Sequence, residues 1–150
     1  MMNASPKGYN ELVHRLLAPE DREKFETIVG SMLSGGTARV VVICGPERSG
    51  KTTLTKLVHK LAIFSIVETG RRVPQVVFQK SGYSPVESDS FVFVETKDFV
   101  APHGAIFICT TGDRLPLTKY YALMHQIDLE LDDIAEYCIQ TYHNNLENNR

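Results

Sequence analysis

The sequence predicts an α/β domain in which a mostly parallel sheet of about five strands is flanked by helices. Three apolar runs, at residues 40–44, 91–94 and 105–110, lack polar alternation, which is typical of parallel strands that are covered on both faces. The segments around these runs place apolar residues at helical spacing. With 150 residues, the chain has room for one domain with a core of its own.

An N-terminal helical segment is expected at residues 1–38. Its helices are predicted at residues 10–17 and 19–33, and Pro19 suits the first position of the second helix. In that second helix, apolar residues recur at helical spacing and form one stripe for burial: Phe25, Ile28, Val29, Met32 and Leu33. The polar, glycine-rich residues 34–37 end this helix and lead into the first strand.

The core of the fold is expected at residues 39–131 and the C-terminal helix and tail at residues 132–150. The expected core elements are a strand at 40–44, a helix at 53–67, strands at 75–79, 91–95 and 105–110, a brief helix at 118–124, and a strand at 126–131. Only nine residues, 96–104, separate two of these strands. We therefore expect an irregular connection there, or an antiparallel pair. Asp132 is expected to cap the last helix.

The segment between the first core strand and its helix matches the pattern G-x-x-x-x-G-K-[ST], the P-loop. In a strand–loop–helix context, backbone N–H groups of this loop converge on a phosphate, and the helix N-terminus adds partial positive charge. Gly45 and Gly50 let the backbone turn tightly against that phosphate. The residues expected to bind the nucleotide are Gly45, Pro46, Glu47, Arg48, Ser49, Gly50, Lys51, Thr52 and Thr53.

Three side chains are assigned roles on Mg²⁺-ATP. Lys51 is expected to bridge the β- and γ-phosphates, and the Thr52 hydroxyl to bind Mg²⁺. Glu95 ends the strand at 91–94, and the magnesium carboxylate usually ends a strand beside the loop strand. Glu95 is therefore the predicted second magnesium ligand and a catalytic residue, with Asp98 as the alternative.

Hydrolysis also needs positive charge on the γ-phosphate. Arg48 lies within the loop, and Arg71 and Arg72 follow the loop helix at its far end. Arg114, in the turn after the strand at 105–110, is therefore the candidate catalytic arginine. We expect it to reach the nucleotide of a neighbouring copy in a homo-oligomeric ring; the alternative is an ordinary solvated turn residue.

Composition limits the partners and the compartment. A formal net charge of −2 gives no overall attraction to nucleic acid, so a DNA or RNA contact would need a local patch. No apolar run approaches the roughly 20 residues of a membrane span, and residues 1–10 lack a signal-peptide core, so an intracellular location is expected. Cys44, Cys109 and Cys138 are expected to be reduced, and no structural metal is expected.

The order of these features resembles that of AAA+ ATPases, and most of all the superfamily three helicases of DNA viruses. The resemblance covers about residues 11–143 and includes the P-loop, the strand with an acidic end at 91–95, and residues 106–112. It implies a viral DNA-replication protein, a ring-forming ATPase with one more strand before its end. This chain has Thr96 where the family generally has a second acid, and Gly112 where it has a sensor asparagine.

Three functions are compatible with the sequence. The first is an AAA+-like ATPase that couples ATP hydrolysis to work on nucleic acid. The second is a small P-loop kinase, although residues 114–119 are few for the lid that closes over the phosphates of a kinase. The third is a nucleotide-binding or interaction protein without catalytic activity.

Overall fold

The computed structural model describes residues 6–80, 90–96, 105–113 and 115–148. Within these ranges the elements follow in the order α1 (Lys7–Leu16), α2 (Pro19–Leu33), β1 (Val40–Cys44), α3 (Lys51–Thr69), β2 (Val76–Lys80), β3 (Phe91–Thr96), β4 (Ile106–Cys109), α4 (Leu117–Leu129) and α5 (Leu131–Asn148). The predicted α/β class is confirmed, and the bounds of α2 and β1 are those predicted.

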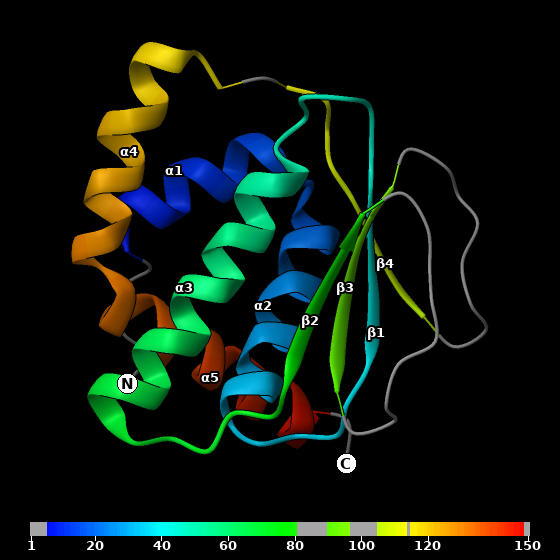
Figure 1. Ribbon diagram of the computed structural model, residues 1–150, viewed down its shortest axis with the longest axis vertical. Helices are drawn as coiled ribbons and strands as arrows, with labels where there is room; N and C mark the ends of the chain where they lie inside the picture. The colour runs from blue at the N-terminus through cyan, green and yellow to red at the C-terminus, as the bar shows by residue number, and fades with distance from the viewer. Residues whose placement is uncertain (1–5, 81–89, 97–104, 114, 149–150) are drawn as a thin grey trace.

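The described strands form one sheet in the order β2-β3-β1-β4, and every neighbouring pair is parallel (Figure 1). Strand β1 lies between β3 and β4, with Val41 opposite Phe93 and Val42 opposite Phe107. Since parallel strands end at the same edge of a sheet, the loop after β1 begins beside the ends of β3 and β4. The alternative of an antiparallel pair is wrong, because β3 and β4 are not neighbours and both run parallel to β1. Their connection, residues 97–104, lies outside the described residues.

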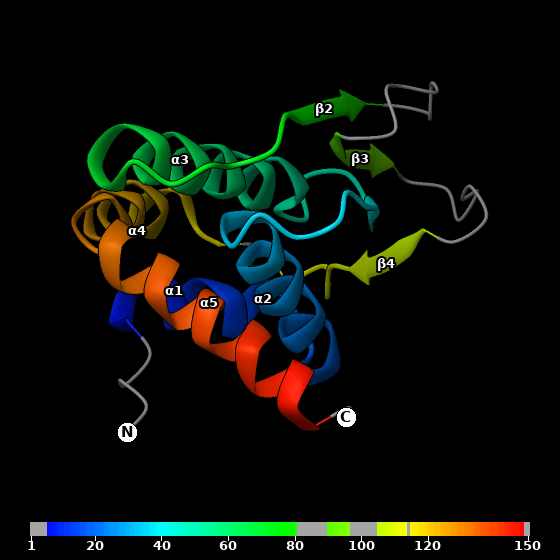
Figure 2. The same cartoon turned by 90° about the horizontal axis from the view of Figure 1, so that it is seen from below.

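The described helices all lie on one side of the sheet (Figure 2). The main core forms between these helices and the strand residues that face them, among them Ile43, Phe93 and Ile108. On the opposite face, Val42, Val92 and Val94 form a second buried cluster. Both faces are thus apolar, which explains why the strand sequences carry no polar alternation.

The predicted strand at 126–131 is wrong, because Gln126–Leu129 are the last residues of α4. Polar and apolar residues do alternate in this segment, but the residues before it already follow the spacing of a helix. Leu123, Met124 and Ile127 are buried on one face of α4, whereas Leu129 is 71% exposed. The described sheet therefore has four strands where about five were expected. Asp132 is not the cap of the last helix as predicted, because α5 begins at Leu131 and Asp132 lies in its first turn.

Helix α5 packs closely along α2. A Cβ on Gly30 of α2 would lie only 2.1 Å from the carbonyl oxygen of Cys138 on α5. Such an approach of two backbones is open only to glycine at that position. The packing joins the N-terminal helical segment to the C-terminal helix, so that both ends of the chain contribute to the core beside the sheet.

Candidate nucleotide-binding site

The loop between β1 and α3 lies at the edge of the sheet where the strands end (Figure 1). Gly50 has φ +93° and Gly45 has φ +154°. A Cβ on Gly45 would lie 1.9 Å from Oγ1 of Thr110, and one on Gly50 would lie 2.7 Å from Cδ1 of Leu16. Both motif glycines are therefore required by their neighbours as well as by the backbone conformation.

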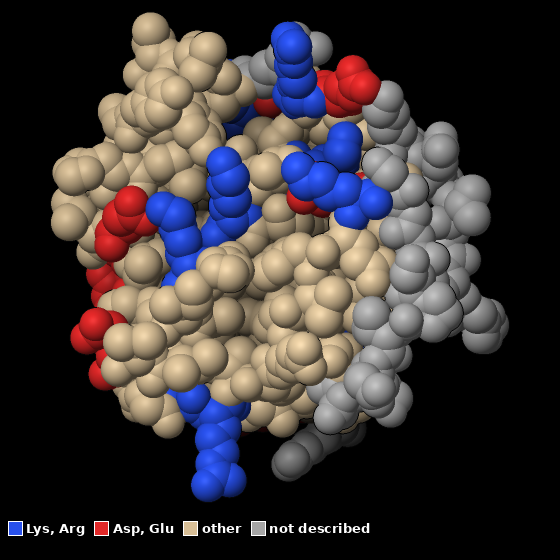
Figure 3. Space-filling view, in the orientation of Figure 1, with Lys and Arg blue, Asp and Glu red and all other residues tan. Residues whose placement is uncertain are grey.

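The N-terminus of α3 opens onto this loop. Gly50 is its N-cap, and no side chain in the described part of the chain caps it. The first N–H groups of a helix have no partner within the helix, and together with the helix dipole they carry about half a positive charge. Figure 3 shows Lys and Arg side chains over the loop and the neighbouring part of α3. The arrangement suits an anion such as a phosphate.

Lys51 is held across the loop. Its Nζ donates hydrogen bonds to the carbonyl oxygens of Gly45 and Pro46, each at 2.7 Å. These are neutral acceptors, and a phosphate oxygen in the loop would be a stronger, charge-assisted partner for the ammonium group. The side chain can therefore exchange its loop contacts for contacts with a ligand.

The carboxylate of Glu95 is held by two hydroxyl groups of α3. Thr52 Oγ1 donates to Oε1 of Glu95 at 2.7 Å, and Thr55 Oγ1 donates to Oε2 at 3.0 Å. Glu95 lies on β3 opposite Ile43 of β1 and is 8% exposed. The sequence placed Thr52 and Glu95 at the site but missed Thr55. The signal was present, because residues three apart on a helix share a face.

Thr52 and Glu95 fit a magnesium ion. They supply a hydroxyl and a carboxylate oxygen, the hard ligands that Mg²⁺ prefers, and both oxygens keep lone pairs beyond their shared hydrogen bond. The described residues contain no group of three or more His, Cys, Asp or Glu that could hold a metal by itself. Mg²⁺ is commonly held by one or two protein oxygens together with phosphates and water, so these two residues are enough for that mode of binding.

The end of β4 fastens the loop to α1. Thr110 Oγ1 donates to Oγ of Ser49 at 2.6 Å, and the Thr110 N–H donates to the carbonyl oxygen of Cys44 at 2.9 Å. The N–H of the next residue, Thr111, donates to the carbonyl oxygen of Leu16 at 2.8 Å. Residues that follow β4 thus hold both the loop and the end of α1 in place.

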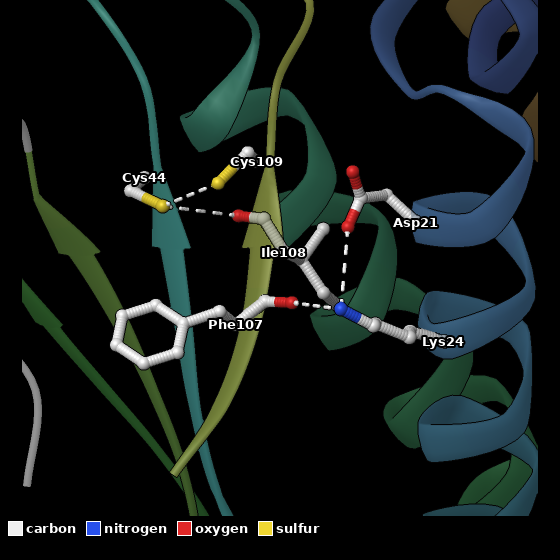
Figure 4. Close-up of polar contacts among 6 residues, drawn as sticks. All are labelled: Asp21, Lys24, Cys44, Phe107, Ile108 and Cys109. Atoms are coloured by element: carbon white, nitrogen blue, oxygen red, sulfur yellow. Dashed lines mark hydrogen bonds and ion pairs between the residues drawn. The ribbon is translucent and has the colours of Figure 1, made fainter. Parts of the chain in front are cut away.

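Two thiols lie side by side at the same edge of the sheet (Figure 4): Cys44 ends β1 just before the loop, and Cys109 ends β4. The sulfur atoms of Cys44 and Cys109 are 2.9 Å apart, and Cys44 Sγ contacts the carbonyl oxygen of Ile108 at 3.6 Å. Burial, and secondly the contact with Cys109, raise the pKa of Cys44 to about 12. On the other side of β4, Lys24 of α2 donates to the carbonyl oxygen of Phe107 at 3.3 Å. Strand β4 is thus anchored both to β1 and to α2.

The structure describes only some of the arginines that were considered from the sequence as sources of positive charge at the γ-phosphate. Arg48 lies on the loop with φ +57°. Arg71 lies beyond the far end of α3, where it pairs with Glu136 at 2.6 Å. Arg114 and Asp98 lie outside the described residues. The structure therefore brings together the loop, Thr52 and Glu95, while the source of a catalytic arginine stays a prediction.

Comparisons with protein-family models, with curated proteins and with solved structures find no significant match. The AAA+ resemblance thus stays an expectation from the sequence. Among the described helices, none combines the length and the apolar content that a bilayer span needs.

Proposed function

We propose that this chain is a P-loop ATPase that binds ATP together with Mg²⁺. The observation that carries the proposal is the 2.7 Å hydrogen bond from Thr52 to Glu95. A glycine-rich loop alone could be a simple turn. Here the final residue of the motif contacts a carboxylate 43 positions later in the sequence, on the strand beside β1. A motif hydroxyl next to an acid is what binding of magnesium and triphosphate by a P-loop requires.

The chain's residues divide the work of binding. N–H groups of the loop and of the first turn of α3 donate hydrogen bonds to the phosphate oxygens, and Lys51 adds a positive charge beside these oxygens. Thr52 and Glu95 would hold Mg²⁺, and Thr55 keeps the Glu95 carboxylate in position. When bound, Mg²⁺ neutralises charge on the β- and γ-phosphates.

Hydrolysis and work on nucleic acid are extensions of this proposal. Turnover needs positive charge at the γ-phosphate, for which Arg114 of a neighbouring copy in a ring is our candidate. The AAA+ resemblance adds DNA or RNA as the partner of such a ring. One observation favours the narrower proposal of nucleotide binding: residues 126–131, where the resemblance implies a strand, are helical up to Leu129. A kinase and a binder without catalytic activity stay the alternatives.

Replacing Lys51 tests the proposal. Lys51→Ala should weaken binding of Mg²⁺-ATP in calorimetry by at least tenfold, roughly 1.5–3 kcal/mol, because a charge-assisted contact with phosphate is lost. The matched control is Lys56→Ala, because Lys56 is exposed and lies five residues further along α3. It should bind ATP like the parent, and circular dichroism should find both variants folded. Equal affinity of Lys51→Ala and the parent would contradict the site.

Phosphate release from the same samples separates the proposed enzyme from its alternatives. An ATPase releases phosphate in the absence of any acceptor. A kinase transfers it only when an acceptor is added, and a binder does neither. Adding DNA or RNA tests whether nucleic acid stimulates the turnover.

A further inference from the structure

The P-loop forms only one wall of a cavity of about 210 Å³. Its loop wall includes Lys51, Thr52 and Thr53, and the opposing wall is made by four side chains from other parts of the chain. Those four are Leu12 and Leu16 of α1, Leu115, and Tyr120 of α4. A phosphate site thus continues directly into a space with an apolar lining and one aromatic ring.

The size of this cavity limits what it can hold. Pockets for whole small-molecule ligands usually measure about 300–1,000 Å³, so this one suits a single moiety of a larger ligand. The polar loop wall suits phosphate, and the leucines and the tyrosine ring suit a flat, weakly polar group. A nucleotide joins these two chemistries in one molecule.

The part of the apolar wall that α1 supplies is fixed in place by burial. Leu12 is fully buried and Leu16 is 2% exposed. Leu16 also packs so closely on Gly50 that a Cβ on Gly50 would lie 2.7 Å from it. Tyr120 is half-buried, whereas the next residue, Tyr121, is 70% exposed. The two rings contact each other edge to face, with their centroids 5.4 Å apart.

We propose that this cavity receives the base of the bound nucleotide and that the ring of Tyr120 contacts the face of that base. This inference rests on the proposed nucleotide binding. Stacking depends on the area of the two rings, so a purine should bind better than a pyrimidine. Apart from the Tyr120 hydroxyl, the polar side chains that line the cavity belong to the loop wall: Arg48, Ser49, Lys51, Thr52 and Thr53.

The experiment compares ATP with inorganic tripolyphosphate, which has the phosphates but no base. Binding to Mg²⁺-ATP and to Mg²⁺-tripolyphosphate is measured by calorimetry for Tyr120→Ala, with Tyr121→Ala as the matched control. Tyr120→Ala should weaken ATP roughly five- to hundredfold, as expected for the loss of one base-stacking contact, and leave tripolyphosphate unchanged. Because its ring contacts that of Tyr120, Tyr121→Ala should weaken ATP less than Tyr120→Ala does and leave tripolyphosphate unchanged. Equal weakening of both ligands, or none, by Tyr120→Ala would overturn the inference.

A second pair of variants covers the case in which Tyr120→Ala does not fold. Tyr120→Phe keeps the ring and should bind ATP like the parent, whereas Tyr120→Leu keeps apolar volume without a ring and should bind it more weakly. Equal ATP affinity of these two variants would contradict base stacking. If the parent binds CTP as tightly as ATP, base stacking is contradicted as well.

Lys51→Ala separates this inference from the proposed function. It should weaken both ATP and tripolyphosphate, because it removes a contact with the phosphates. If it weakens both while Tyr120→Ala changes nothing, the base pocket is refuted and nucleotide binding stands. If Lys51→Ala changes neither ligand, the proposed function itself has failed.

Discussion

The cysteines show how the position of a residue determines its reactivity. Cys44 and Cys109 are register partners on parallel strands, yet Cys44 is fully buried and Cys109 is partly exposed. Burial raises the pKa of Cys44 to about 12, and it raises the pKa of Cys138, buried on α5, far above the usual range. The thiolate is the reactive form of cysteine, so both buried thiols should be inert in the folded protein.

Alkylation should therefore be selective. At pH 8, a pKa raised this far leaves Cys44 almost entirely as the unreactive thiol. Iodoacetamide should modify Cys109 first in the native protein, and Cys44 and Cys138 only after unfolding in guanidinium. Peptide mass spectrometry over a time course measures this order. Cys44 reacting as fast as Cys109 in the folded protein would show that it is not shielded.

At the scale of the elements, the turn between α4 and α5 positions α1. The Glu130 carboxylate in this turn accepts hydrogen bonds from the N–H groups of Gly8 and Tyr9, each at 3.0 Å, and from Nε2 of Gln126 at 2.8 Å. Burial alone would raise the pKa of Glu130, but these three hydrogen bonds outweigh burial and lower it. A single acid thus caps the helix that carries Leu12 and Leu16 to the cavity.

Glu130→Gln should lower the free energy of unfolding by about 1 kcal/mol at pH 7, because it removes the charge and one acceptor from this cap. Since the folded pKa is lowered, the contribution is fully present above the unfolded pKa and is lost as the pH falls through the folded pKa. Urea unfolding at pH 7 and at pH 3 measures the difference between parent and variant. The difference should shrink at pH 3.

The control for this comparison is Glu136→Gln, because Glu136 is an exposed acid on α5. The pair that Glu136 forms with Arg71 lies at the surface and contributes little, so this variant should change stability clearly less at pH 7 than Glu130→Gln does. A Glu130→Gln difference that stays the same at pH 3 would show that the carboxylate charge does not stabilise α1.

Some elements could be predicted from the sequence because the spacing of their apolar residues fits either a helix or a strand, but not both. The bounds of α2 follow from its N-terminal Pro19 and its single apolar stripe, and β1 is an unbroken apolar run. Residues 126–131 fit both kinds of spacing. Ile127, Leu129 and Leu131 alternate as in a strand, whereas Leu123 and Ile127 are four residues apart, as on one face of a helix. Burial of Ile127 beside Leu123 decides for a helix, and that contact depends on tertiary packing, which no local pattern contains.

The candidate site was predictable to the same extent. The loop and Glu95 follow from a motif and from a strand end, so the pair formed by Thr52 and Glu95 could be expected before the structure. The cavity wall could not be, because Leu12 and Tyr120 are more than a hundred residues apart and appear in the sequence as ordinary core positions. Residues that meet only through the fold carry no local signal.

At the scale of the whole molecule, the order of the strands creates the site. Strand β1 delivers the loop to the middle of the sheet edge, β3 brings Glu95 to one side of it, and Thr110 follows β4 on the other. The described helices stand on one face of the sheet (Figure 2). On that face, side chains of α1 and of the start of α4 line the cavity beside the loop. Loop, acid and apolar wall thus meet at one place, as expected for an α/β sheet, where ligands bind at the carboxyl ends of the strands.

The most direct test of this account is the magnesium dependence of ATP affinity in the parent, in Glu95→Gln and in Glu68→Gln, an exposed control at the far end of α3. Calorimetry with Mg²⁺ and with excess chelator gives the gain in affinity that the ion provides. We expect Glu95→Gln to bind magnesium-free ATP like the parent and to lose about 10- to 100-fold of that gain, because its amide cannot replace a carboxylate at the ion. Glu68→Gln should keep the whole gain. If Glu95→Gln gains as much from Mg²⁺ as the parent does, Glu95 does not serve the ion and the central claim is contradicted.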